Sequence, residues 1–220
     1  MKHRQAKRKV SRKFLGYILI SVAIYAVAVI GYRLVWTNYV AEQEAKSKTI
    51  SIREEWNTPN VEATTKPSAG FAFLYIPRLR DSVWELPISQ GIDSTQLETG
   101  TGHYPKSALP GESGNFAVAG HRSGNGEPFA HFDRLQQGDR IVIETKDKWF
   151  VYVLDQDIEV KPDEVWVLDP NPAGLASTVG TDKLITLTTC TPRYGTTGRW
   201  IWWGHLVEEL PKEEPPSDVK

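Results

Sequence analysis

The hydrophobic positions of this 220-residue chain are concentrated first near its N-terminus. Residues 14–32 form an unbroken run of 19 uncharged, mostly apolar residues. At about 1.5 Å per residue, a helix of that length is roughly 28 Å long and matches the hydrocarbon core of a bilayer. Arg33 and Trp36 follow, where a snorkelling cation and an interfacial aromatic ring are expected. The pattern predicts one transmembrane anchor over residues 14–36.

A cleaved signal peptide is the alternative interpretation of this run. Ala26, Val27 and Ala28 resemble a cleavage site, but the run continues past them and exceeds the about 7–15 residues of a signal core. Residues 1–13 hold seven basic residues and no acidic one, and such a flank stays in the cytoplasm. We therefore predict a single-pass protein of the cell membrane, with a cytoplasmic tail over 1–13 and the bulk of the chain outside.

Beyond the anchor the pattern changes twice. Residues 37–69 mix charges with Thr, Pro, Ser and Ala. We predict an extracellular linker there, in which residues 40–56 can continue the helix and the rest has too little apolar content to fold alone. Residues 70–210 show short β-branched or aromatic runs between Gly, Pro and Asp turns, which predicts one barrel or sandwich domain. The Pro-rich, charged residues 211–220 are expected to form a flexible tail.

The last predicted strand contains the sequence WIWW. Alternation along a strand places Trp200 and Trp202 on one face and Ile201 and Trp203 on the other. Packing inside the domain is the default role for these rings, and contact with a large substrate is the alternative.

Short helical turns are expected at 98–105 and 162–168. Seven runs have the composition of strands: 71–76, 83–89, 115–120, 140–145, 148–155, 183–189 and 199–209.

The charges of the chain are divided unevenly. Eight of the 26 Lys and Arg residues lie at or before Arg33, whereas all 27 Asp and Glu residues lie at or after Glu42. The outer part therefore carries 18 basic and 27 acidic residues, a net charge of −9. Because phosphate binding needs a basic face, this charge argues against a nucleic-acid partner.

Cys190 is the only cysteine of the chain. In an exported protein, a lone cysteine is either an inert buried residue or a reactive thiol. Cys190 ends the predicted strand 183–189, Arg199 begins the next strand nine residues later, and His121 follows the strand 115–120. A thiol, an imidazole and a guanidinium at strand ends are the groups that acyl transfer requires: a nucleophile, a general acid and base, and an oxyanion partner.

Other residues compete for these roles. Arg193 is also near the cysteine, but it lies in a turn, where its direction is less well fixed than that of Arg199. His103 in TGHYP is the strongest alternative to His121, because that loop is expected to line the cleft. His131, within PFAHFDRL, fits a surface or packing role better.

Segments around these residues are similar to those of a known protein family. TLTTC (186–190), followed by Arg199, and AVAGHR (117–122), followed by PFAHFDRLQQGDRIVI, fit two signatures of the sortases. These are membrane-anchored cysteine transpeptidases of Gram-positive bacteria. The resemblance covers residues 71–208 and implies an all-β fold, a single closed eight-stranded barrel with short helices, and three catalytic residues: His121, Cys190 and Arg199.

GHYPKSALPGESGN (102–115) is most similar to class E sortases of actinobacteria. The resemblance implies exported proteins with a C-terminal LPxTG-like or LAxTG-like sorting signal as substrates, cleaved between Thr and Gly. It also implies a lipid-linked peptidoglycan precursor as the amine acceptor. VKPDEVWVLDP (160–170) resembles the loop that receives the signal. By the same resemblance, a groove for the first two residues of the signal would be lined by Ala119, Val160, Pro162, Val165 and Val167.

Three other readings stay open. A cysteine peptidase would use the same groups with water in place of the amine. A pilus-polymerising sortase is a second reading, although residues 37–69 hold no aromatic lid motif and the chain has no second apolar run of membrane length. A non-catalytic, membrane-tethered β-domain would bury Cys190.

We expect no cofactor and no metal, because the acidic residues that suggest calcium lack a ligand loop and fit a solvated face: Asp155, Asp157, Glu159, Asp163 and Glu164.

Overall fold

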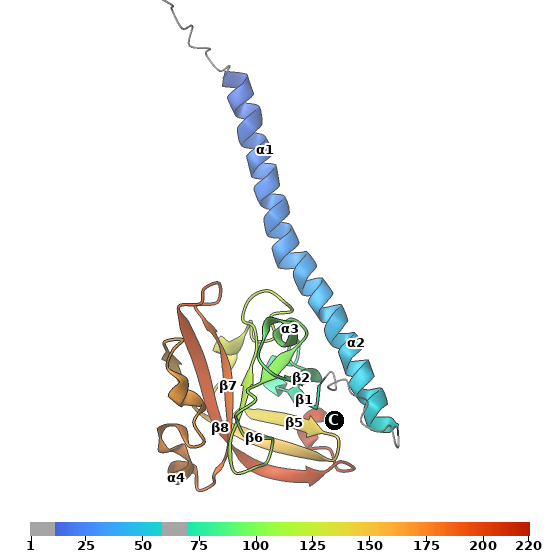
Figure 1. Cartoon of the computed structure of the whole chain (residues 1–220), viewed down its shortest axis with the longest axis vertical. Coiled ribbons are helices and arrows are strands. Elements are labelled where there is room, and N and C mark those ends of the chain that lie inside the picture. The colour runs from blue at the N-terminus through green and yellow to red at the C-terminus, as the bar shows by residue number, and fades with distance from the viewer. Residues whose placement is uncertain (1–11, 59–69) are drawn as a thin grey trace, which may run out of the picture.

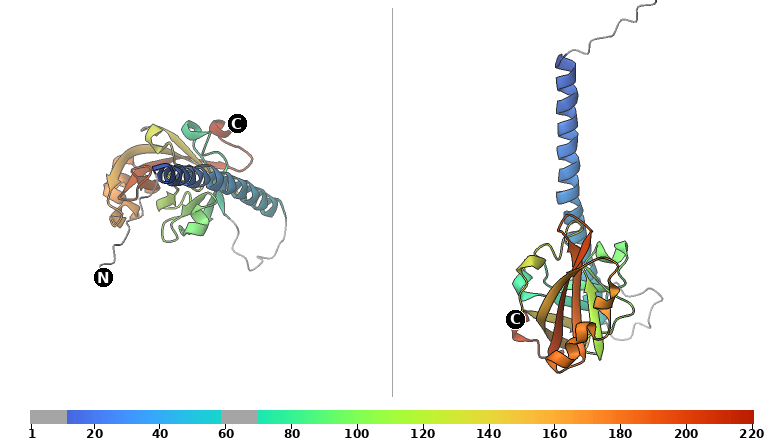
Figure 2. Two further views of the ribbon diagram at one scale, coloured as in Figure 1. Left: turned by 90° about the horizontal axis from the view of Figure 1, so that it is seen from above. Right: turned by 90° about the vertical axis from the view of Figure 1, so that its left-hand side faces the viewer.

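The computed structural model describes residues 12–58 and 70–220. Residues 1–11 of the predicted tail and residues 59–69 of the predicted linker lie outside the described part. The described chain consists of a long helical rod and a β-domain, and the rod extends well beyond the β-domain at one end (Figures 1 and 2).

The rod begins with the apolar run. Helix α1 (Arg12–Gly31) passes through one π-helical turn (Tyr32–Trp36) into α2 (Thr37–Asn57). No residue of α1 is buried, and α1 is the one helix of the described ranges that is long and apolar enough to cross a membrane. An N-terminal apolar helix is therefore present, and it is compatible with a single-pass anchor.

Eight strands form a closed barrel in the order β1–β2–β3–β4–β7–β8–β6–β5. The pairs β2–β3 and β4–β7 are parallel, and the other neighbouring pairs are antiparallel. The closed eight-stranded barrel that the resemblance implied is confirmed. The strands are β1 (Ala72–Tyr75), β2 (Leu86–Gln90), β3 (Thr101–His103), β4 (Gly114–Ala119), β5 (Arg140–Thr145), β6 (Lys148–Val160), β7 (Lys183–Thr191) and β8 (Gly198–Pro211).

Short helices connect these strands. The turn predicted at 162–168 is present as a 3-10 segment, whereas the turn predicted at 98–105 is wrong, because the centre of that segment is β3. The hydroxyl of Thr101 donates to Pro87 O at 3.1 Å, and pairing with β2 and β4 fixes this Gly-containing stretch as a strand. The short helices are η2 (Pro77–Leu79), α3 (Ser94–Leu97), η3 (Phe132–Arg134), η4 (Val165–Leu168), η5 (Pro172–Gly174), α4 (Leu175–Val179) and η6 (Ser217–Val219).

The two faces of β8 contribute to different apolar clusters. Trp202 belongs to the main core, against which Trp200 packs. Ile201 and Trp203 belong to a separate cluster with Val167, under the connection between β6 and β7. The predicted alternation along WIWW is therefore confirmed, and the ring of Trp203 holds the β6–β7 connection by donating from Nε1 to Val167 O at 3.0 Å.

Helix α2 packs against the barrel. Ile52 is 0% exposed and lies in an apolar cluster with Phe73 and Val151. Burial of one such side chain contributes about 1.5–3 kcal/mol. The helix expected over 40–56 is thus present, and it forms part of the folded domain.

The last ten residues also pack against the barrel, although the composition of 211–220 predicted a flexible tail. Pro216 is buried, and Val219 packs against the cluster around Ile52. Asp218 accepts a hydrogen bond from Arg140 Nε at 3.0 Å. Partners on β5 and α2, far away in the sequence, hold this segment in place.

Candidate active site

Three strand ends meet at one edge of the barrel. Since β4 and β7 are parallel neighbours, their carboxyl ends lie at the same edge of the barrel. The turn that joins β7 to β8 also lies at this edge, so β8 begins there. Cys190, near the end of β7, is directly opposite Arg199, near the start of β8. Directly opposed residues project to the same face with Cβ atoms about 4.5–5.5 Å apart. The Cβ atoms of Cys190 and Arg199 are therefore neighbours on one face of the sheet.

His121 follows β4 at the same edge. The end of β4 is tied to β7, because Gly120 N donates to Thr188 O at 3.1 Å and Thr189 Oγ1 donates to Gly120 O at 2.8 Å. A Cβ atom at Gly120 would lie 2.7 Å from the ring of Phe129. Glycine therefore allows the chain to approach this ring closely just before it presents the histidine.

The imidazole of His121 is half-buried and has few partners. Its Nε2 atom lies 3.5 Å from Asn125 Nδ2, while its backbone oxygen accepts from Phe129 N at 3.0 Å. Burial lowers the pKa of His121 below its ordinary value, and the exposed carboxylate of Glu98 opposes this shift. The imidazole is thus neutral at neutral pH and able to accept a proton.

Arg199 keeps most of its hydrogen-bonding capacity. Its Nη1 atom donates to Thr196 O at 3.2 Å and to Gly198 O at 2.9 Å. Among the ion pairs of the described residues, none includes Arg199. A guanidinium has five N–H donors. Donors therefore remain for an oxygen that becomes negatively charged beside Cys190.

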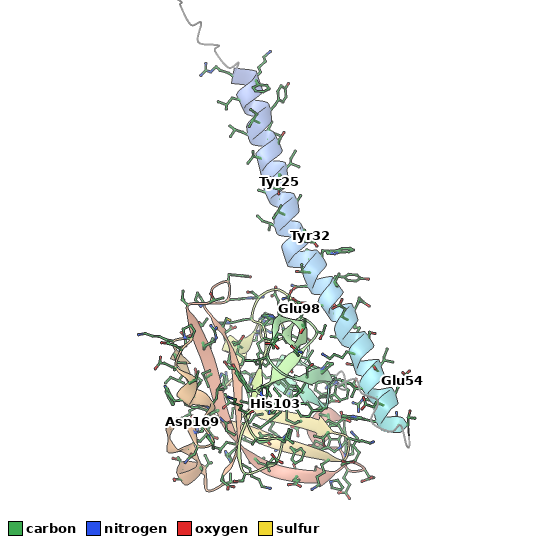
Figure 3. The ribbon with its side chains drawn as sticks, in the orientation of Figure 1. Tyr25, Tyr32, Glu54, Glu98, His103 and Asp169 are labelled. Atoms are coloured by element: carbon green, nitrogen blue, oxygen red, sulfur yellow. The ribbon has the colours of Figure 1, made fainter. Side chains whose placement is uncertain are left out.

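The alternative residues are engaged elsewhere. Arg193 pairs with Glu127 at 2.7 Å and lies over the ring of Tyr194. His103 is 1% exposed, and its ring contacts Gln90 Oε1 and Ala108 O, each at 2.9 Å. His103 is a core histidine whose hydrogen bonds are satisfied by the interior, and its label lies over the barrel in Figure 3.

The remaining histidines differ in their surroundings. His131 is half-buried at the start of η3, and its backbone oxygen accepts from Arg134 N at 2.9 Å. His205 Nδ1 lies 2.8 Å from Asp155 Oδ2 on the neighbouring strand β6. The backbone of His131 and the ring of His205 are therefore held by contacts outside the Cys190–Arg199 pair.

Two residues beside the candidate site were not predicted from the sequence. Burial raises the pKa of the Tyr104 hydroxyl, which is also close enough to Arg199 and Cys190 to be affected by their charges. Arg122 is 8% exposed and lies over the ring of Trp200 at 4.7 Å. The sequence feature that could have identified them is their position, because Tyr104 and Arg122 each directly follow a candidate histidine.

Two hollows are lined by close neighbours of Cys190 and Arg199: Tyr104 in one, and Thr191 and Gly198 in the other. One, of about 450 Å³, lies between the loop that starts at Tyr104 and the β6–β7 connection, where Val165 lines it. The other, of about 520 Å³, is lined by Val160 and by the neighbouring turn of the β7–β8 hairpin.

The other predicted groove residues lie in different environments. Val167 is buried in the cluster around Trp203, and Pro162 is exposed. Ala119 is buried at the end of β4, opposite Thr188 of β7. The structure therefore brings Val160 and Val165 to the two hollows, whereas Val167 supports the loop from below.

The acidic residues of β6 have protein partners. Asp157 accepts from Trp200 Nε1 at 2.8 Å, and Glu159 accepts from the Thr191 hydroxyl at 3.3 Å. No group of three His, Cys, Asp or Glu residues in the described ranges converges in a way that could hold a metal ion.

Comparison with known proteins gives one consistent family. A family model described as a sortase domain matches residues 74–207. Sortase SrtE1 of Streptomyces coelicolor is 39% identical over 219 residues, which cover 96% of this chain and 61% of that protein. Sortase SrtE2 of the same organism is 34% identical over 226 residues, covering 94% of this chain and 87% of that protein. The chain thus spans less than two thirds of the length of SrtE1.

Solved structures agree with the sequence matches. Sortase E1 from Streptomyces coelicolor, with a tripeptide in the active site, superposes with a TM-score of 0.62 at 39% identity, covering 71% of this chain and all of that one. Sortase E from Streptomyces avermitilis superposes with a TM-score of 0.60 at 38% identity, covering 69% and 97%. The resemblance to class E sortases is confirmed.

Proposed function

Because this chain belongs to the sortase family, we propose that it is a membrane-anchored cysteine transpeptidase that joins exported proteins to the cell wall. The observation that carries the proposal is the direct pairing of Cys190 with Arg199 at the barrel edge. This pairing puts a nucleophile and an unpaired cation at directly opposed positions of neighbouring strands, and His121 follows the adjacent strand at that edge. Nucleophile, oxyanion donor and general acid are the groups that acyl transfer needs.

The first half-reaction forms a thioester. The neutral imidazole of His121 takes the proton of the Cys190 thiol. The resulting thiolate attacks the Thr carbonyl carbon of an LPxTG-like or LAxTG-like sorting signal, and Arg199 donates hydrogen bonds to the oxygen that becomes negatively charged. The Thr–Gly bond then breaks, and His121 in its protonated form gives a proton to the departing Gly amine. The hollow beside Val165 suits the leading Leu of the signal, because an apolar surface removes that side chain from water.

The second half-reaction transfers the protein to an amine. His121, now neutral, takes a proton from the amine as the nitrogen attacks the thioester carbon, and the Cys190 thiolate leaves. A lipid-linked peptidoglycan precursor is the acceptor in this proposal. An anchor at residues 14–36 places enzyme, secreted substrate and lipid-borne acceptor at the same membrane surface.

The proposed orientation has a direct test. We expect the N-terminus to be cytoplasmic and the barrel outside, with the apolar helix retained in the mature protein. Protease added to intact cells should digest the barrel, and the mature protein should keep its first residues. A mature N-terminus near residue 29 in a membrane-free fraction would contradict the anchor.

The chemistry is tested with the full-length protein in detergent micelles. The protein is mixed with LPxTG-like and LAxTG-like peptides, with and without a primary amine, and the products are identified by mass spectrometry. We expect a peptide cut after Thr and joined to the amine. Cleavage with water alone, even at high amine concentration, would indicate a peptidase. If neither product forms and native Cys190 resists a small alkylating reagent, the β-domain is non-catalytic.

A further inference from the structure

The loop between His121 and Phe129 has an unusual backbone. Four successive residues have positive φ angles: Gly124 at 72°, Asn125 at 52°, Gly126 at 80° and Glu127 at 46°. Two of these are not glycine, and residues with side chains pay about 1–3 kcal/mol for such conformations. A strained conformation of this kind persists only where surrounding contacts hold it. The contacts at this loop come mainly from the side chain of Glu127.

The carboxylate of Glu127 joins three segments. Oε1 accepts from Asn38 Nδ2 of helix α2 at 2.8 Å and from Gly124 N of its own loop at 3.0 Å. Oε2 accepts from Arg193 Nη2 of the β7–β8 turn at 2.7 Å. The side chain is only 13% exposed. Burial alone would raise the pKa of Glu127, but these hydrogen bonds outweigh it and the pKa lies below its usual range.

Further contacts connect this loop to the histidine and to the rod. Gly126 N donates to Asn38 Oδ1 at 3.1 Å, so Asn38 holds the loop from both its amide atoms. Asn125 lies between Gly124 and Gly126 in the chain, and its side chain is 3.5 Å from His121 Nε2. The position of Asn125 is therefore set by the residues on either side of it, and those residues are fixed by Glu127 and Asn38.

We propose that Glu127 is a positioning residue: its carboxylate fixes the loop after His121 against helix α2 and the β7–β8 turn, and so orients the imidazole. The inference rests on the proposed function of His121. It also gives helix α2 a role in the reaction, because Asn38 lies just beyond the π-helical turn that follows the apolar helix. The continuation of the anchor thereby contacts the loop of the proposed general acid.

The activity test uses the full-length protein in detergent micelles with a sorting peptide and an amine. Glu127→Ala should lower kcat by about 10- to 100-fold, because small displacements of a catalytic group have effects of this size. KM for the peptide should not change, since Glu127 lines neither hollow. Glu127→Gln keeps an acceptor for Asn38 and should lose less. Glu112→Ala is the matched control, because Glu112 also binds a loop amide, Leu109 N at 2.9 Å.

A double substitution separates positioning from general damage. Since Arg193 acts on the loop through Glu127, Arg193→Ala in the Glu127→Ala background should cause no further loss of kcat. Fully additive losses would contradict the proposed role of Glu127. A rise in KM at unchanged kcat would instead place Glu127 in substrate binding and overturn the inference.

An NMR measurement tests the inference without any turnover. In protein labelled at histidine, the ring signals of His121 should shift and broaden in Glu127→Ala and Asn38→Ala, and remain unchanged in Glu112→Ala. Unchanged His121 signals would overturn the inference even if the protein is an active transpeptidase. Shifted signals in a protein without activity would overturn only the proposed function. If Glu127→Ala does not fold, the same readings on Glu127→Gln and Asn38→Ala decide the matter.

Discussion

Two groups of polar side chains in this protein are arranged in opposite ways. The first, here called the Glu144 cluster, consists of Glu144, Tyr75, Arg53 and Lys212. Arg53 binds both carboxylate oxygens of Glu144, at 2.5 and 2.6 Å, and the Tyr75 hydroxyl donates to the same carboxylate at 2.5 Å. Lys212 completes it with a further ion pair. Every charge in this cluster has a partner.

The second group, formed by Cys190, His121 and Arg199, has few partners. In the described residues, Arg199 reaches only backbone oxygens, and His121 Nε2 has one contact, at 3.5 Å. Charged groups whose donors and acceptors all have protein partners hold segments together, but they have no donor or acceptor left for a substrate. Groups with unused donors and acceptors contribute little to folding, yet they can stabilise charge that appears during a reaction. This difference predicts opposite results when each group is mutated.

The largest expected effect is on activity. Cys190→Ala should abolish thioester formation and all turnover, because no other thiol exists in the chain. The midpoint of thermal unfolding should change little, since the side chain is only half-buried at a strand end. Peptide turnover and circular dichroism measured on the same sample check both statements. A collapse of thermal stability would show that the sulfur is a packing element.

The Glu144 cluster should give the reverse result. Glu144→Ala removes the partner that Arg53 and Lys212 share. Because these cations are 30% and 28% exposed and Arg53 keeps Glu85, the loss should stay below the about 3–5 kcal/mol of a fully buried pair. Turnover per folded molecule should stay unchanged. Unfolding in urea, followed by tryptophan fluorescence, measures the loss. Glu209→Ala is the control, because Glu209 pairs with Lys148 on the surface and such pairs contribute at most about 1 kcal/mol.

The pH dependence of this loss follows from the pKa of Glu144. Burial would raise that pKa, but hydrogen bonds from Arg53, Lys212 and Tyr75 outweigh it, so the pKa is lowered in the folded state. The stabilisation is therefore present above the ordinary pKa of a carboxyl group and lost as the pH falls through the lowered value. The stability difference between the wild type and Glu144→Gln should shrink in acid. A difference that grows in acid would contradict the assignment.

Much of the barrel could be predicted from local composition, and the exceptions have a common cause. The long β-branched and aromatic runs are strands, and the nine-residue spacing placed Arg199 beside Cys190. Strand β3 was missed because Thr101–His103 has no strand pattern of its own and is held by β2 and β4. Helix α2 and the last ten residues look polar, and they dock through a few side chains each, among them Ile52 of α2 and Pro216 of the last segment. In each of these segments, the structure depends on contacts with residues that are distant in the sequence.

The candidate site divides in the same way. Residue type and strand position pointed to the cysteine, the histidine and the arginine. Glu127 had no such signal, because a glutamate in a Gly-rich loop is usually solvated. Its importance depends on Asn38 and Arg193, which are 89 and 66 residues away in the sequence. Nothing in the local pattern predicts that these three side chains meet.

Arg199 tests whether the unpaired cation is used in the reaction. Arg199→Ala should lower turnover by about 10²–10³, the usual effect of losing one oxyanion donor. Arg199→Lys should keep a small residual rate, because lysine retains the charge but lacks the planar fork of donors. The loss should fall on kcat rather than on peptide affinity. Arg193→Ala should lose much less. Near-normal turnover with weakened peptide binding in Arg199→Ala would make this arginine a substrate anchor.

The smallest expected effect separates two histidines by their neighbouring carboxylates. Glu98 lies on the side of the barrel next to the helical rod (Figure 3) and raises the pKa of His121 against the effect of burial. Glu98→Gln should therefore lower the pKa of His121 further. Glu112 acts in the same direction on His103, whose pKa is lowered by burial. Glu112→Gln should lower the pKa of His103 and leave His121 unchanged.

Histidine NMR titrations of the wild type and the two variants measure both pKa values in one experiment. Because Glu98 and Glu112 are exposed, added salt should reduce both shifts by screening. In the Glu144 cluster, direct hydrogen bonds to a buried carboxylate should make the stabilisation far less sensitive to salt. If the His121 shift proved as insensitive to salt as the Glu144 cluster, Glu98 would be in direct contact with the imidazole. The candidate site would then contain a saturated pair of its own, and its contrast with the Glu144 cluster would fail.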